Sequence, residues 1–596
     1  MSLHSTEHGT VAISIKPFRA CFLLLVAVLS GCASQVDMVD PITASTVVAP
    51  NQGIVVARIV NASGYPAPLN QLTITPQNLN TSEDVKYQRL QSSGSRLNGT
   101  SIFASPVAAG TYALTSLRAF HSNGSFYYSH AVPSGTELGT FAVAPGQVTD
   151  LGTLIYYQKP DGDQYFKEVI RIPEQPGEVL DKHFSFFEYD EAAIQSWNDD
   201  GLDDERNTFF ASAAQNPTTF EDRYLAPDGS VYFLGKLGVI LKRTPEGEWE
   251  MDVVDTNLDL TAIAQNERGD IVVGGAEGRL FIKRVDSDWT DLSIDHSYDV
   301  EHLMFLDADT IDMVALQMLK LSVLRSTLDR PQLGWDEINA FATMDGWKTS
   351  PPPPESDDGA RTVSVKKPKR IVRSELHDID GRQYISVYTQ RATSSPLFSQ
   401  ATADHFAYEP STWKAAKPEL MPEIVTSIPA GKSKLGIQSP GFWSWSGLPV
   451  YSRYAASTDS WEEMNTFVYR CASGITTSST CGTNESSGNA ILAKKTNFSF
   501  RSVPWFSSER DAIAVVTFTD RDFWTGETDY DVKILGTNDG GLTWTDTGHS
   551  LPNDLCASFV PEVGDRILLS CSSTGDFYES TDMGASWEHV RQHENF

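Results

Sequence analysis

Cys32 is the first residue of this chain whose surroundings indicate a specific chemistry. It follows two cationic residues, Lys16 and Arg19, and a nearly unbroken apolar run, 20–29. An apolar run of about ten residues is typical of a signal peptide and is too short to span a bilayer. The two residues directly before the cysteine are small, so they allow an extended backbone that a protease can cleave. The thiol of Cys32 is then free to carry a lipid.

The tetrapeptide Leu29-Ser30-Gly31-Cys32 resembles the lipobox of bacterial lipoproteins. The resemblance implies that residues 1–31 are removed, that Cys32 carries a thioether-linked diacylglyceryl group, and that the new amino terminus is acylated. Two or more acyl chains anchor a protein stably to a membrane. Because no Asp follows Cys32, a feature that commonly marks inner-membrane retention, we expect an outer-membrane protein facing the periplasm. The alternative is an ordinary secretory signal in which Cys32 is incidental.

Four further cysteines remain after the signal: Cys471, Cys481, Cys556 and Cys571. An even number in an exported chain favours disulfides, with three possible pairings. The most local pairing joins Cys471 to Cys481 and Cys556 to Cys571, since each pair flanks an expected hairpin. The alternative is four reduced, buried thiols. Their spacing does not support a zinc site, and no metal is expected.

Arg171-Ile172-Pro173 could in principle hold an anionic sugar, because an arginine binds a carboxylate through two parallel hydrogen bonds. The tripeptide resembles one in sialidases, which also need two further arginines, a Tyr–Glu nucleophile pair and an acid/base Asp. The segment after Pro173 does not resemble the Asp-containing first blade of that family. Neither a G-x-S-x-G elbow nor a phosphate-binding Gly loop is present. The sequence therefore predicts neither an enzyme nor a cofactor, with a glycoside hydrolase as the alternative.

The composition favours a β-rich protein with many turns. The chain has 596 residues with 13 Trp, 20 Tyr, 42 Gly and 31 Pro, which fits many short strands and turns. Its formal net charge of −31 repels phosphate and so disfavours nucleic acid as a partner. We expect a signal (1–31), a tether (32–52), a strand-rich domain (53–157), a connector (158–222) and a repeat domain (223–596).

The strand-rich segment 53–157 contains two recognisable patterns. Residues 106–114 include a G-x-Y-x-L strand, and residues 141–154 include a V-x-P-G-x-x-x-x-L-G strand. These patterns resemble the prealbumin-like β-sandwich modules of exported bacterial proteins. The resemblance implies a spacer or binding domain and no chemistry.

The segment from 223 onward repeats with a period of 40 residues. Gly229 and Gly238 in the first unit correspond to Gly269 and Gly278 in the second, and each unit ends in a Trp, at 249 and 289. This period is that of a propeller blade with four antiparallel strands. Glycine at the turns admits a positive φ, and one Trp per unit fills the space between adjacent blades. Trp335, Trp413, Trp461 and Trp505 mark expected later blade ends.

The segments 537–544 and 580–587 both fit S/T-x-D-x-G-x-x-W and lie 43 residues apart. The pattern resembles the Asp-box turn of sialidase-like, sortilin-like and photosystem-assembly-factor-like propellers. In that turn the Asp caps backbone N–H groups, the Gly takes a strained conformation and the Trp packs beneath. Such turns are structural and peripheral. The residues are Thr537, Asp539, Gly541, Trp544, Ser580, Asp582, Gly584 and Trp587.

Residues 348–373 form an expected insertion in the repeat domain, with Pro351–Pro354 followed by acidic and then basic residues. Such a composition cannot pack a core and favours a projecting loop. Its basic half could bind an acidic partner or lipid phosphates, and the alternative is a solvated loop.

Together these patterns predict an all-β protein: a lipid anchor, a prealbumin-like β-sandwich and a roughly seven-bladed Asp-box β-propeller. The resemblance to non-enzymatic propellers implies a scaffold that holds a protein or peptide, since loops on a rigid framework carry recognition. Carbohydrate is the alternative ligand.

Overall fold

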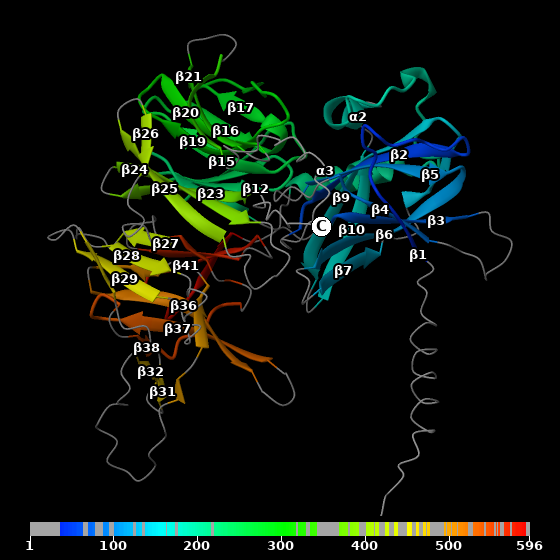
Figure 1. Ribbon diagram of the computed structural model, residues 1–596. Helices are drawn as coiled ribbons and strands as arrows, with labels where there is room; N and C mark the ends of the chain where they lie inside the picture. Colours follow the sequence, from blue (N-terminus) through cyan, green and yellow to red (C-terminus); the bar gives the residue numbers. More distant parts are fainter. Residues whose placement is uncertain are drawn as a thin grey trace, which may run out of the picture.

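The chain folds into two parts that lie side by side: an N-terminal domain and a larger set of radiating sheets (Figure 1). A computed structural model describes residues 36–63, 69–77, 87–93, 100–122, 127–133, 138–161, 164–172, 177–215, 220–317, 320–328, 334–342, 369–379, 382–391, 401–409, 412–415, 424–427, 434–438, 450–455, 460–463, 469–471, 474–476, 494–495, 497–501, 504–508, 510–521, 528–541, 544–553, 556, 558–560, 566–571 and 575–591. Among these residues no helix is long and apolar enough to cross a membrane.

The N-terminal domain contains two sheets. The first has the order β1-β4-β3-β6-β7, with β8 also pairing with β6. The second has the order β10-β9-β2-β5. The strands are β1 (Val36–Val39), β2 (Gln52–Asn61), β3 (Gln71–Pro76), β4 (Tyr87–Gln91), β5 (Thr100–Ala108), β6 (Gly110–Ser122), β7 (Tyr127–Pro133), β8 (Thr140–Val143), β9 (Val148–Asp161) and β10 (Gln164–Ile172).

One hydrophobic core joins the two sheets. Leu72 on β3 and Leu117 on β6 pack in the same buried cluster as Phe103 on β5 and Tyr156 on β9. Alternation along each strand places these side chains on the inner faces. Burying such a side chain contributes about 1.5–3 kcal/mol, so this cluster accounts for the pairing of the sheets. The prealbumin-like β-sandwich expected for this domain stays a prediction.

Both expected boundaries of this domain are wrong. β1 lies inside the expected tether 32–52 and pairs in parallel with β4, so folded structure begins at Val36. β10 lies inside the expected connector 158–222 and pairs along its length with β9. A four-residue edge strand carries no detectable periodicity, and β9 continues beyond Tyr157, the expected end of the domain.

The connector covers the outer face of the second sheet. It contains α2 (Glu178–His183), a 3₁₀ turn, η2 (Glu191–Ala193), and α3 (Asp203–Gln215). Val179 and Leu180 of α2 pack against Ile54 and Val56 of β2. The helix α3 begins with three acidic residues, which suit the positive end of a helix dipole.

The described residues from 220 to 591 include seven sheets of four or more strands, arranged as consecutive blades. From first to last they comprise β11 (Phe220–Leu225), β12 (Val231–Gly235), β13 (Val239–Arg243) and β14 (Trp249–Val253); β15 (Leu260–Gln265), β16 (Ile271–Gly275), β17 (Leu280–Lys283) and β18 (Trp289–Asp291); β19 (Asp299–Phe305), β20 (Thr310–Gln317), β21 (Lys320–Thr327) and β22 (Asp336–Ala342); β23 (Lys369–Ile379), β24 (Arg382–Arg391), β25 (Ala401–Glu409) and β26 (Thr412–Ala415); β27 (Ile424–Ser427), β28 (Lys434–Gln438), β29 (Val450–Ala455) and β30 (Ser460–Glu463); β34 (Asn497–Phe500), β35 (Trp505–Phe506), β36 (Ala512–Arg521), β37 (Thr528–Thr537) and β38 (Thr545–Asp546); β39 (Ser558–Val560), β40 (Ile567–Ser570), β41 (Phe577–Ser580) and β42 (Glu588–Arg591).

Every blade is one continuous stretch of chain, and the ring closes through side chains. Phe220 and Phe233 of the first blade pack with Phe577 of the last. Arg243 of the first blade forms a buried ion pair with Glu579 of the last. The expected β-propeller of about seven blades is therefore confirmed.

The tryptophans pack between blades as expected. Each of five packs against a cluster built from its own blade and the preceding one; they are Trp249, Trp289, Trp335, Trp413 and Trp587. Trp461 lies on the outer strand β30, as expected of a blade end. Trp505 is the exception, since it lies on β35 beside β36 rather than at a blade end. Its assignment from the sequence is wrong.

Two further details differ from expectation. The insertion 348–373 ends earlier, because Lys369, Arg370 and Arg373 belong to β23 and pair with β24. The propeller also begins at Phe220 rather than 223. A small additional sheet, made of β31 (Tyr469–Cys471), β32 (Gly474–Thr476) and β33 (Lys494–Lys495), lies between the fifth and sixth blades in sequence. The remainder of the insertion, 348–368, lies outside the described residues.

Candidate functional site: the channel rim beside the domain junction

The first strands of four consecutive blades share a β-bulge close to their start. The register shifts between Phe220 and Asp222 on β11 and between Leu260 and Ala262 on β15. It shifts likewise between Val300 and His302 on β19, and at 371–373 on β23. A bulge leaves one residue out of the ladder and redirects its side chain. The same end of four neighbouring strands therefore presents irregular backbone, and we call residues 221, 261, 301 and 372 the channel rim.

Polar side chains at the channel rim link successive blades. The hydroxyl of Thr261 donates to the carbonyl oxygen of Val300. His302 Nε2 lies 3.0 Å from Ser374 Oγ, which also donates to Glu301 Oε2 at 3.4 Å. Glu301 and His302 are half-buried, so part of each side chain is accessible. The rim can therefore offer a carboxylate, an imidazole and backbone groups to a ligand.

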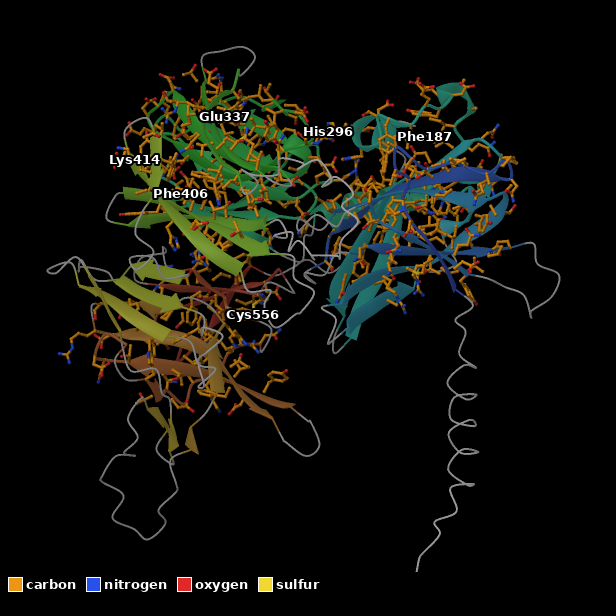
Figure 2. The ribbon with its side chains drawn as sticks, viewed as in Figure 1. Phe187, His296, Glu337, Phe406, Lys414 and Cys556 are labelled. Carbon is orange, nitrogen blue, oxygen red and sulfur yellow. A yellow bond between two sulfur atoms is a disulfide. The ribbon has the colours of Figure 1, made fainter. Side chains whose placement is uncertain are left out.

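The N-terminal domain packs at this same end of the propeller. Antiparallel strand order places the start of each first strand beside the loop that joins its second and third strands. In the first two blades these loops hold Leu237 and Ala276, which pack against Val60, Ile155 and other apolar residues of the second N-terminal sheet. We call this the junction end of the propeller. Figure 2 shows His296 on the side facing the N-terminal domain.

A buried ion pair crosses the junction. Arg58 on β2 donates to Glu277 at 3.1 Å, and the two side chains are 3% and 2% exposed. His183 Nε2 of α2 lies 3.4 Å from the same carboxylate. Glu277 has a φ of 53°, and its N–H donates to Asp299 at 2.9 Å, at the start of β19. The ion pair thus joins the N-terminal domain to the second blade, and the backbone of Glu277 extends this link to β19.

The disulfide also lies at the junction end. Cys556 and Cys571 are bonded, and they join the chain entering β39 to the chain leaving β40. This bears out one of the two local pairings expected from the sequence. Cys32, Cys481 and the side chain of Cys471 lie outside the described residues, so the lipid site and the second pairing stay predictions.

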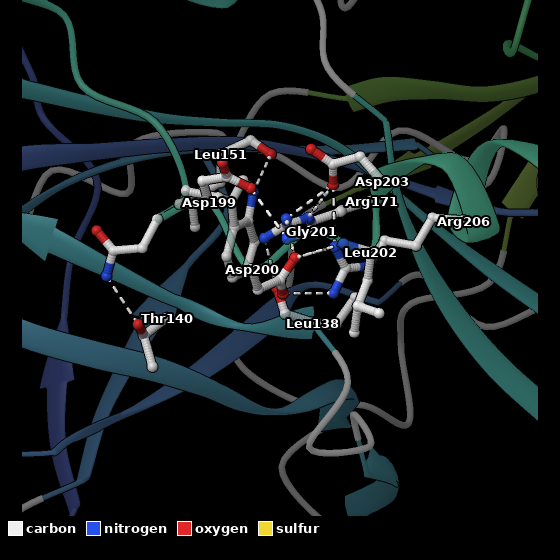
Figure 3. Close-up of polar contacts among 12 residues, drawn as sticks. Leu138, Thr140, Leu151, Arg171, Asp199, Asp200, Gly201, Leu202, Asp203 and Arg206 are labelled. Carbon is white, nitrogen blue, oxygen red and sulfur yellow. Dashed lines mark hydrogen bonds and ion pairs between the residues drawn. The ribbon is translucent and has the colours of Figure 1, made fainter.

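Arg171 belongs to the N-terminal domain and not to the propeller. It is on β10, and its guanidinium donates to Leu138 O at 2.7 Å, Asp203 at 2.8 Å and Asp200 at 3.2 Å (Figure 3). Its guanidinium carbon lies 5.0 Å from the centre of the Trp197 ring. Because protein groups already occupy its donors, the sialidase-like clamp proposed for Arg171 is wrong.

The acidic partners of Arg171 are shared with a second arginine. Arg206 donates to Asp200 at 2.7 Å and to Asp203 at 2.9 Å. Hydrogen bonds, chiefly from Arg206 to Asp200 and from Arg171 to Asp203, lower the pKa of both carboxyls. Both therefore stay ionised at neutral pH. This group fastens the connector to the edge of the N-terminal domain, beside a cavity of about 180 Å³ that Trp197 and Asp150 help to line.

The two segments that fit the Asp-box pattern make matching hydrogen bonds at the opposite end of the blades. In one, Gly541 N–H donates to Thr537 Oγ1 at 3.0 Å, and in the other Gly584 N–H donates to Ser580 Oγ at 2.8 Å. Each hydroxyl donates to the carboxylate two residues on, at 2.8 Å in both turns. Hydrogen bonds, first from Ser586, lower the pKa of Asp582 to about 2. Since each turn joins the third and fourth strands, it lies away from the channel.

The channel rim was not found from the sequence, although one signal was available. Residues 221, 261 and 301 are Glu, Thr and Glu and repeat at the 40-residue period of the blades. Their meaning depends on the register shift, which the period alone does not show. No group of three or more metal-binding side chains occurs in the described part of the chain.

A comparison with protein-family models found no match, and neither did a comparison with curated proteins. Among solved structures, the chain is similar to YCF48 bound to D1 peptide, with 12% identity, a TM-score of 0.34 and coverage of 62% of this chain and 94% of that one. It is similar to an ulvan lyase of a polysaccharide lyase family, with 10% identity, a TM-score of 0.34 and coverage of 63% and 92%. It is also similar to the β-propeller domain of the Trilobed protease from Pyrococcus furiosus, with 7% identity, a TM-score of 0.32 and coverage of 63% and 96%. The fold assignment rests on the seven consecutive sheets themselves.

Proposed function

We propose that this protein is a lipid-anchored extracytoplasmic scaffold that binds a protein or peptide client at the channel rim. The observation that carries the proposal is the repeated bulge at the start of β11, β15, β19 and β23. First strands of a propeller are sheet edges, and a bulge exposes further backbone donors and acceptors. Such groups suit an extended peptide, which binds mainly through its own backbone.

The charge of the chain and of the rim sets the expected chemistry of the client. Asp299 and Glu301 stand at the start of β19 on a protein with a net charge of −31. Electrostatic complementarity favours a neutral or basic client segment and accelerates its association. The client is therefore expected to bind more weakly as the salt concentration rises.

The position of the anchor supports the scaffold role. Val36 begins β1 four residues after Cys32. Four extended residues span at most about 14 Å, so a lipid on Cys32 would hold the N-terminal domain close to the bilayer. The Arg58–Glu277 pair then fixes the propeller relative to that domain. The proposal places the protein at the outer membrane, facing the periplasm, and assigns it no reaction.

Affinity purification of the full chain from detergent-solubilised membranes tests this function. The variant Glu301→Arg reverses a rim charge, and the matched control Glu250→Arg reverses an exposed charge on the outer strand β14. We expect the wild type and Glu250→Arg to recover a client in stoichiometric amount. Glu301→Arg should reduce the amount of recovered client about tenfold or more. A Cys32→Ala variant shows whether the anchor is needed to meet the client.

Two outcomes would contradict the proposal. Equal client recovery with Glu301→Arg and with the wild type would remove the rim as the binding site. Absence of any client from an acylated, membrane-bound protein would contradict the scaffold function and favour glycan binding, which a glycan array then tests.

A further inference from the structure

The outer face of the first N-terminal sheet carries two arginines on either side of β3. Thr73 of β3 pairs with Arg89 of β4, and Gln71 of β3 pairs with Arg118 of β6. Paired residues and residues two apart share a face of a sheet. The neighbours Leu72, Leu90 and Leu117 point into the core, so these four side chains point away from it.

Among the described residues, no carboxylate pairs with either arginine. Neither Arg89 nor Arg118 forms a hydrogen bond or an ion pair with any residue that the structure describes, and Arg89 Nε is buried. Burial and the positive charge of Arg118 lower the pKa of Arg89. Asp40, at the nearby sheet edge, accepts a hydrogen bond from Gln91 at 2.9 Å. Two like charges thus lie close together in a chain that has a large excess of acid.

The residues between the arginines are polar and buried. Gln71 and Thr73 are each 6% exposed. Within the described part of the chain, Gln71 Oε1 and Thr73 Oγ1 have no hydrogen-bond partner. A buried hydroxyl without a partner lowers stability, and an oxyanion that accepts a hydrogen bond from Thr73 Oγ1 would remove that cost. Thr73 Oγ1 can donate to an oxyanion placed between the two guanidinium groups, and Gln71 can donate to it only through its Nε2 amide, because Oε1 is an acceptor.

We propose that Arg89, Arg118, Gln71 and Thr73 form a binding site for an oxyanion of the phosphate class. Two guanidinium groups can each bind an oxyanion through parallel hydrogen bonds, and the anion removes their mutual repulsion. The proposal does not depend on the client-binding function of the propeller.

The surroundings of the site favour the phosphate of a lipid headgroup over a free ion. Met38 of β1 pairs with Arg89, and Tyr87 lies two residues from it on the same face. Met38 is 48% exposed and Tyr87 is 38% exposed. An exposed methionine and tyrosine beside an arginine suit a membrane interface, where one part of the surface is apolar and the other is wet. Met38 also lies only six residues from Cys32.

The test uses the full mature chain with Cys32→Ala, so that an anchor does not itself bring the protein to vesicles. Thermal unfolding is followed in sodium phosphate and in sodium chloride of equal ionic strength, and flotation is measured with phosphatidylglycerol and phosphatidylcholine vesicles. We expect phosphate, phosphatidylglycerol vesicles or both to bind, and Arg89→Gln and Arg118→Gln each to weaken binding about tenfold. Arg501→Gln, which removes an exposed propeller arginine, is the charge-matched control.

The pattern of binding identifies the source of the oxyanion. Binding to phosphatidylglycerol vesicles but not to inorganic phosphate assigns the lipid headgroup, and the opposite result assigns a free ion. Failure of both probes to bind overturns the site, as does an equal loss with Arg501→Gln.

A second measurement separates a ligand site from a structural role. Replacing Arg89 with Gln removes a half-buried charge that Arg118 repels, so the unfolding midpoint in chloride is expected to stay the same or rise. A clear fall of that midpoint, in a variant that also loses phosphate binding, would show that Arg89 supports the fold and would overturn the proposal.

Discussion

The two outer faces of the N-terminal domain differ in whether their charged side chains have partners of opposite charge. The face formed by β2 and β9 lies under the connector and the propeller, and there Arg58 is paired with Glu277 while Asp150 accepts N–H groups of Gly152 and Gly177 at 2.9 Å. The face formed by β3, β4 and β6 carries Arg89 and Arg118 without a protein partner in the described residues. On the face that packs against the rest of the protein, the chain supplies counter-charges for its own buried charges. On the other face it supplies none for the two arginines, and a bound anion can take that place.

Breaking the Arg58–Glu277 pair is the largest effect we expect. Arg58→Met leaves the Glu277 carboxylate buried and without its cationic partner, which costs about 3–5 kcal/mol. The double variant Arg58→Met/Glu277→Leu removes both charges and is expected to recover most of that loss. Chemical denaturation of the three proteins measures both effects.

The double variant decides between two explanations of the junction. Recovery shows that the ion pair mainly fixes how the domains meet. A double variant as unstable as Arg58→Met would show instead that shape, rather than charge, holds the junction, and the contrast between the two faces would lose its basis.

The junction end of the propeller should also tolerate less change in its loops than the opposite end. Gly238, at the junction end, has a φ of 75°, and a Cβ there would lie 2.3 Å from the carbonyl oxygen of Val254. Gly229, at the opposite end of the same blade, has a φ of 84°, but the nearest atom to a Cβ is a Pro245 side-chain carbon at 3.4 Å. We expect Gly238→Ala to cost about 3 kcal/mol and Gly229→Ala about 1 kcal/mol.

Thermal unfolding of the two alanine variants compares them directly, because they share the backbone strain and differ only in the backbone contact. Equal losses would mean that the strain alone sets the cost. The junction end would then be no less tolerant than the opposite end of the blade.

Much of this architecture could be predicted from the sequence because it repeats. The 40-residue spacing of Gly229 and Gly269 and of the two tryptophans that follow reflects a local unit, so it identified the propeller. The junction could not be predicted, since Arg58 and Glu277 are 219 residues apart and nothing local marks them as partners. The oxyanion site was missed for the same reason: Gln71, Arg89 and Arg118 come together only through strand register.

The carboxylates that bind Arg171 are intermediate between the two faces in exposure. Asp200 is 26% exposed and yet forms ion pairs with both Arg171 and Arg206. Hydrogen bonds from Arg206 and the charge of Arg171 lower its pKa below the ordinary value of about 4. A carboxyl with a lowered folded-state pKa stabilises the protein above its unfolded pKa, and this contribution is lost as the pH falls through the folded value. The wild type should therefore be more stable than Asp200→Asn at pH 6. The difference in unfolding free energy should be smaller than those expected for the Arg58 and glycine variants, and it should shrink below about pH 4.

Denaturation of both proteins at pH 6 and pH 3 provides the check. A difference that is independent of pH would mean that Asp200 acts through its shape and hydrogen bonds alone. The connector would then be fastened without a contribution from its charge.

Salt gives the smallest effect and the most direct comparison of the two faces. Added ions screen the repulsion between Arg89 and Arg118 on the face formed by β3, β4 and β6, whereas the Arg58–Glu277 pair is shielded from solvent. In sodium chloride without phosphate, Arg89→Gln should gain about 0.5 kcal/mol over the wild type at 50 mM and lose that advantage near 500 mM. The deficit of Arg58→Met should stay unchanged over the same range. The opposite result is a stability deficit of Arg58→Met that changes with salt and a stability gain of Arg89→Gln that does not. It would mean that solvent reaches the Arg58–Glu277 pair and not the two arginines. The proposed division of structural and ligand-binding charge between the two faces would then be wrong.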